Sequence, residues 1–185
     1  GFMHNMAASA AIPTDSLRSP TFTRKHGTTA SIMDYARFNY VAQPADRGVR
    51  LTPPRLGVYD YYAVEWAYRL FPGSKGYEDD AKQLRNLVGK HEGDPFYRYG
   101  LQQTNTRYDP SAIEEDLSND PVKAGDYGMA NLRFILSNLD KWIGDEDGGK
   151  RKAELYNEIL QQAMRYVRHV FVNVPGIYLY QTSEK

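Results

Sequence analysis

The sequence contains no cysteine, which excludes disulfide bonds, thiolate metal ligands and cysteine nucleophiles. It also lacks an excess of charge, because 23 lysines and arginines balance 23 aspartates and glutamates. Without a bulk basic field, we expect neither a nucleic acid partner nor attraction to an anionic membrane. No run of about 18 apolar residues occurs, so no membrane span is predicted.

The composition is otherwise that of an ordered protein. Apolar residues make up 41% and charged residues 25% of the 185 positions, which is enough for a packed core and argues against disorder. A chain of this length predicts one domain, or one large domain with a small appendage. Tyrosine is unusually frequent, with 15 residues, and these side chains could either line a substrate cleft or cover a core with their amphipathic rings.

Helical periodicity begins after the first third of the chain. Longer helices are predicted over about 59–71, 77–89, 121–143 and 150–173. Asp60 is suited to cap the first of them, and Asp120 followed by Pro121 predicts the N-cap and first residue of the third. In contrast, 13–30 has no period and is predicted to be a long ordered loop, and 177–180 a short terminal strand. The predicted fold class is mainly α, with long ordered loops in the N-terminal third.

Two short motifs near the start of the chain carry chemical information. Gly1-x-x-His4 is followed by the run Ser31-Ile32-Met33-Asp34-Tyr35. Together they resemble the second half of the metzincin zinc-peptidase signature, H-E-x-x-H-x-x-G-x-x-H followed by a Met-turn. The resemblance implies that His4 is the third zinc ligand and that Met33 packs beneath the three imidazoles without binding the metal. In astacin-like and serralysin-like members a tyrosine at the offset of Tyr35 reaches the zinc or the oxyanion.

The resemblance covers most of the chain and points to a bacterial metzincin-like family with a helical C-terminal region. The matching segments are 4–9, 23–40, 56–68, 94–100 and 109–124. It implies one continuous domain with two parts: 1–55, containing the end of the zinc motif and the Met-turn, and 56–185, a helical subdomain of about four longer helices. Such peptidases are periplasmic, cell-envelope or secreted proteins, so the same location is expected here.

One part of the signature is missing, because no H-E-x-x-H occurs in the sequence. His26, His91 and His169 have no H-x-x-x-H spacing and cannot replace its two histidines. We therefore expect a fragment of a zinc endopeptidase that hydrolyses peptide bonds with a zinc-activated water. Its partners would be a peptide or protein substrate and the N-terminal remainder of the polypeptide that carries H-E-x-x-H. The 185-residue chain alone is expected to be inactive and to bind no stoichiometric zinc.

Two other interpretations stay open. A group of acids could form a calcium loop, but its spacing matches no known loop, so a helix cap and solvated charges are predicted instead. These acids are Asp109, Glu114, Glu115, Asp116 and Asp120. The alternative function is a non-catalytic helical binding or scaffold module, in which the run from Ser31 to Tyr35 would be a coincidence or a relic of a peptidase.

Overall fold

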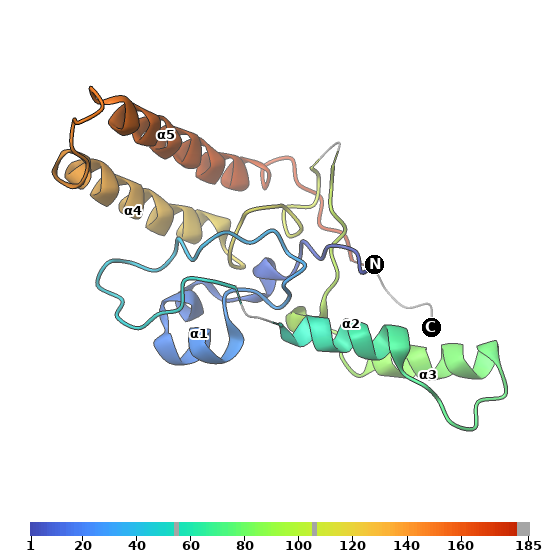
Figure 1. Ribbon diagram of the computed structural model, residues 1–185. Helices are drawn as coiled ribbons and strands as arrows, with labels where there is room; N and C mark the ends of the chain where they lie inside the picture. The colour runs from blue at the N-terminus through green and yellow to red at the C-terminus, as the bar shows by residue number, and fades with distance from the viewer. Residues whose placement is uncertain (54–55, 105–106, 181–185) are drawn as a thin grey trace.

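The computed structural model describes residues 1–53, 56–104 and 107–180, and these residues form a mainly helical protein without strands. The α-helices are α1 (Pro20–His26), α2 (Val58–Tyr68), α3 (Tyr77–Gly89), α4 (Pro121–Trp142) and α5 (Lys150–Phe171). Short 3-10 helices are η1 (Ser9–Ala11), η2 (Thr14–Arg18) and η3 (Pro95–Tyr97). Figure 1 shows α4 and α5 packed together at one end, α2 and α3 projecting at the other, and irregular backbone with α1 between them.

α4 begins where the sequence places its cap. The Asp120 side chain accepts a hydrogen bond from the backbone N–H of Lys123 (2.9 Å), and Pro121 is the first residue of α4. α3 carries three acids in its first turn, where negative charge interacts favourably with the helix dipole. The prediction of a mainly α fold with four longer helices is therefore confirmed.

Two local predictions are wrong. The segment 13–30 is not a loop throughout, because it contains η2 and α1. Ser19 caps α1 by accepting a hydrogen bond from the N–H of Phe22 (3.2 Å), and Pro20 occupies its first turn. The segment 177–180 is not a strand: the N–H of Leu179 donates to the carboxylate of Asp109 (3.1 Å) rather than to a neighbouring strand.

The main hydrophobic core joins distant parts of the sequence. Its fully buried members are Ile12, Leu17, Val41, Leu117 and Ala124. The N-terminal third therefore packs against the start of α4 and the segment before it, which holds the irregular backbone in place without a sheet. Within the described residues, no helix has both the length and the apolarity needed to cross a bilayer.

Candidate functional site

The backbone of the two residues after His4 forms hydrogen bonds with two separate segments of the chain. The N–H of Asn5 donates to the carbonyl of Met33 (3.1 Å), and the N–H of Met6 donates to the carbonyl of Gly100 (2.8 Å). His4 thus enters a buried segment that lies between the predicted Met-turn and the backbone near residue 100.

Asn5 is completely buried and its side chain uses both polar atoms. Its Nδ2 donates to the carbonyl of Arg98 (2.9 Å), and its Oδ1 accepts from the N–H groups of Ala7 (3.2 Å) and Gly100 (2.9 Å). A Cβ on Gly100 would lie 2.7 Å from the Cβ of Ala7, so only glycine allows this close approach. Asn5 therefore fixes the backbone directly after His4. No pattern in the sequence marks Asn5 for this role.

The predicted Met-turn is a turn at Ile32 and Met33 held by an acid from α2. Asp60 accepts hydrogen bonds from the Ser31 hydroxyl (Oδ1, 2.6 Å) and from the N–H of Ile32 (Oδ2, 3.0 Å). The Ser31 hydroxyl in turn accepts from the N–H of Met33 (3.0 Å). Asp60 also caps its own helix, as the sequence predicts, by accepting from the N–H of Gly57 (2.5 Å). The same carboxylate therefore joins the start of α2 to the turn.

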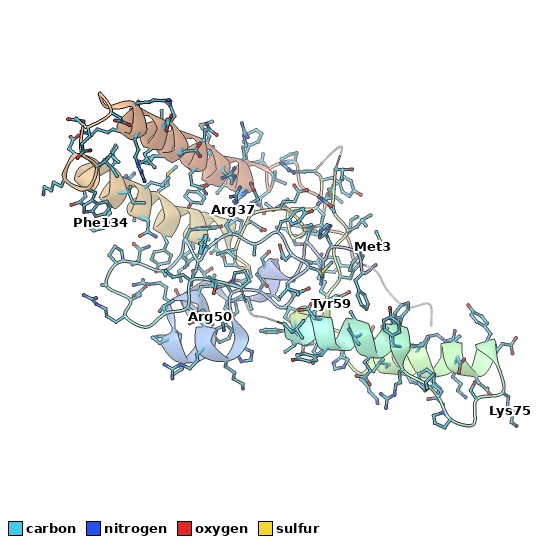
Figure 2. All side chains as sticks on the ribbon, in the orientation of Figure 1. Met3, Arg37, Arg50, Tyr59, Lys75 and Phe134 are labelled. Atoms are coloured by element: carbon cyan, nitrogen blue, oxygen red, sulfur yellow. The ribbon has the colours of Figure 1, made fainter. Side chains whose placement is uncertain are left out.

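The start of α2 lies against the backbone just before the turn. The N–H of Tyr59 donates to the carbonyl of Ala30 (3.0 Å). A Cβ on Gly57 would lie 1.9 Å from that carbonyl oxygen, which no side chain can tolerate. Figure 2 labels Tyr59 at the end of α2 that faces the central part of the molecule. Glycine at position 57 is thus a condition for the contact between α2 and the turn.

The fold brings the two predicted site residues together. The rings of His4 and Tyr35 have centroids 4.4 Å apart and an interplanar angle of 49°. Tyr35 is 47% exposed and His4 is partly exposed, so this pair can be reached from solvent. Met33 is half-buried in the turn that precedes Tyr35. The roles of His4, Met33 and Tyr35 in metal binding stay predictions.

Behind the turn lies a buried pair of acids linked by Ser9. The N–H of Ser9 donates to Oδ2 of Asp34 (2.7 Å) and its hydroxyl donates to Oδ1 of Asp116 (3.2 Å). Burial raises the pKa of Asp34 to about 7. Burial, followed by the nearby Asp34 carboxyl, raises the pKa of Asp116 well above its ordinary value. Burial thus favours the protonated form of both carboxyls compared with an exposed aspartate.

The prediction that the acids of segment 109–120 are solvated charges is therefore wrong for two of them. Asp116 and Asp109 are both buried. Asp109 accepts from the N–H (2.9 Å) and hydroxyl (2.6 Å) of Ser111 as well as from Leu179. Spacing along the chain could not reveal this burial, because it depends on packing against distant segments. Only Asp120 has the predicted role as a helix cap.

Several tyrosines pack with one another rather than opening a cleft. Tyr62 on α2 makes edge contacts with Tyr59 (5.8 Å), Tyr97 (5.4 Å) and His91 (5.3 Å), and His91 stacks on Tyr97 at 3.7 Å. These rings join α2 to η3. Tyr61, by contrast, is 65% exposed. The cover role foreseen for the tyrosines therefore fits this cluster.

His4 and Tyr35 are the candidate site residues that the structure brings into ring contact. Within the part of the chain that the structure describes, no three histidine, cysteine, aspartate or glutamate side chains are grouped so as to hold a metal. His26 packs on Phe22 (4.7 Å) and His169 is buried near Tyr166 (6.5 Å), so both lie in other clusters. One accessible imidazole beside one phenol fits the ligand types of a metzincin centre but cannot complete it.

Comparison with known proteins agrees with this geometry. No curated protein and no solved structure matches the chain. A family model described as Met-zincin matches residues 1–185, which is the whole chain. The accessible His4–Tyr35 pair at the turn of Met33 and the match over the full length lead to one conclusion: the chain belongs to the Met-zincin family.

Proposed function

We propose that this chain forms one part of a zinc endopeptidase centre in which His4 is one of three imidazole ligands. The observation that carries the proposal is the 4.4 Å ring contact between His4 and Tyr35, directly after the turn at Met33. These residues are distant in sequence, and the fold places them on one accessible surface. Membership of the Met-zincin family supports a metallopeptidase role in general.

The chemistry expected of this chain follows from the positions of the two side chains. Zinc held by three imidazoles lowers the pKa of a bound water and polarises the carbonyl of the scissile peptide. His4 would hold the metal through a ring nitrogen. The exposed Tyr35 hydroxyl would donate a hydrogen bond to the substrate oxygen as negative charge develops on it. The other two imidazoles and the carboxylate base would come from an H-E-x-x-H segment, which this sequence does not contain.

The ligand role of His4 is tested in a longer polypeptide, in which residues 1–185 follow the H-E-x-x-H segment that the proposal requires. Zinc per chain is measured by mass spectrometry for the unaltered protein, for His4→Ala and for the control His91→Ala, which removes a histidine packed on Tyr97. We expect His4→Ala to lose zinc and peptide hydrolysis, and His91→Ala to keep both. Unchanged zinc in His4→Ala would remove His4 from the centre.

The 185-residue chain by itself provides a second test. We expect it to hydrolyse no casein-type substrate and to bind no stoichiometric zinc, because a single imidazole is a weak ligand set. Hydrolysis by the purified chain would contradict the proposal. If the longer polypeptide also binds no zinc, the alternative of a non-catalytic helical module is favoured instead.

A further inference from the structure

A continuous series of hydrogen bonds runs from α2 to the residue after His4. It begins at the Asp60 carboxylate, which accepts from the Ser31 hydroxyl (2.6 Å). That hydroxyl accepts from the N–H of Met33 (3.0 Å), and the carbonyl of Met33 accepts from the N–H of Asn5 (3.1 Å). Three of its four residues are buried: Asp60 is 7% exposed, and Ser31 and Asn5 are completely buried.

We propose that Ser31 and Asp60 are positioning residues that hold the turn of Met33 so that Tyr35 faces His4. The two sides of the ring contact are anchored separately. Asn5 fixes the His4 side through its bonds to Arg98 and Gly100, as described above. The Tyr35 side is fixed through Ser31 and Asp60, since these two residues satisfy the N–H groups of Ile32 and Met33.

Ser31 is the informative position for a test because, among the residues that the structure describes, its hydroxyl has two partners, the Asp60 carboxylate and the N–H of Met33. Ser31→Ala removes the acceptor of the Met33 N–H and leaves that group unsatisfied in a partly buried turn. The bonds from Asp60 to the N–H groups of Ile32 and Gly57 remain, so α2 keeps its cap. The turn should then relax while the rest of the fold is retained.

Thr23 offers a matched control. It is also completely buried, its hydroxyl donates to the carbonyl of Ser19 (2.8 Å), and it accepts from the N–H of Arg50 (3.1 Å). Thr23→Val therefore removes a buried hydroxyl that, like that of Ser31, donates one bond and accepts one from a backbone N–H, but it lies in α1 and outside the series that leads to His4. Asp60→Asn is a second test variant. It keeps the side-chain volume but replaces one acceptor oxygen of the carboxylate with an amide NH₂, a donor that then faces other donors.

The experiment measures proton–proton cross-relaxation between aromatic rings in the metal-free 185-residue chain by NMR. Cross-peaks between the rings of His4 and Tyr35 report the positioning, and those between Tyr40 and Tyr166, whose centroids are 4.7 Å apart, report the rest of the fold. We expect Ser31→Ala and Asp60→Asn to lose the first set several-fold and to keep the second. Thr23→Val should keep both.

The inference is overturned if the His4–Tyr35 cross-peaks keep their intensity in Ser31→Ala or are absent from the unaltered chain. It is also overturned if Thr23→Val weakens them as much as Ser31→Ala, or if both sets weaken together, because either result would show a general effect on stability. The catalytic meaning of the positioning rests on the proposed function. The NMR result does not, since it requires no metal, so failure of the zinc test and failure of this test are distinguishable.

Discussion

Acid should destabilise this protein through His169, which is 5% exposed on α5. Burial lowers its pKa from 6.5 to about 4. The charges that face it act in opposite directions: Glu115 raises the pKa, whereas Arg165 and Arg107 lower it. The Nδ1 atom has no hydrogen-bond partner in the described part of the chain. Glu115 and a backbone hydrogen bond at Glu114 favour the protonated ring but do not outweigh burial. The neutral ring is thus the form that the folded protein accepts.

The sign and size of the effect follow from proton linkage. The unfolded chain binds a proton at this side chain below pH 6.5, whereas the folded protein resists it until about pH 4. The free energy of unfolding is therefore fully retained above the unfolded pKa and is lost as the pH falls between the two values. The difference between the two pKa values corresponds to about 3 kcal/mol in total, of which about 2 kcal/mol is lost by pH 5.

The measurement is urea unfolding at a series of pH values for the unaltered chain and for His169→Leu. The two proteins can differ in their free energy of unfolding by a constant amount at every pH. Only the change of this difference with pH reports the titration of His169. We expect the free energy of unfolding of the unaltered chain to fall relative to the variant by about 3 kcal/mol between pH 7.5 and pH 4. The buried acids Asp34 and Asp116 titrate in both proteins and cancel. Parallel profiles would refute the reasoning.

Other substitutions test single features of the structure. Gly57→Ala should lower the free energy of unfolding, measured by urea unfolding, by about 3 kcal/mol or more. The reason is that the added Cβ would lie 1.9 Å from the carbonyl oxygen of Ala30. Asp120→Ala should cost about 1 kcal/mol in the same assay, through loss of the α4 cap. Asp116→Asn should gain stability over the unaltered chain as the pH rises above 4, since the raised pKa of Asp116 makes ionisation in the fold unfavourable. Tyr35→Phe in the longer polypeptide should lower kcat about 100-fold and leave zinc content unchanged, because one oxyanion donor is lost.

The helices that could be predicted are those whose ends carry local signals. α3 has the predicted bounds, and α4 begins at Pro121 after the Asp120 cap. α1 carries such signals in Ser19 and Pro20, but its seven residues, about two turns, are too short to show a period. The extended segment 177–180 was misread as a strand because alternation predicts extended backbone but not its partner.

The residues of the candidate site also divide into those that a local sequence signal predicts and those that it does not. The juxtaposition of His4 and Tyr35 agrees with the resemblance, because both belong to motifs in which residue type and spacing carry the information. Asp60 could be predicted as a helix cap, yet its bonds to Ser31 and Ile32 could not, since they depend on how α2 packs on the turn. The burial of Asp116 was missed for the same reason.

The absence of strands among the described residues explains why no single motif contains this site. In a sheet, ladder hydrogen bonds would hold the backbone around His4, and the hydrophobic alternation of the strands would mark it in the sequence. Here two polar side chains, Asn5 and Asp60, make the equivalent bonds to backbone N–H and carbonyl groups. Glycine permits a close backbone contact beside each of them, because a Cβ at Gly100 would collide with Ala7 and a Cβ at Gly57 would collide with the Ala30 carbonyl. The residues that support the His4–Tyr35 pair are therefore isolated polar residues and glycines in separate segments, and they form a pattern only when the chain is folded.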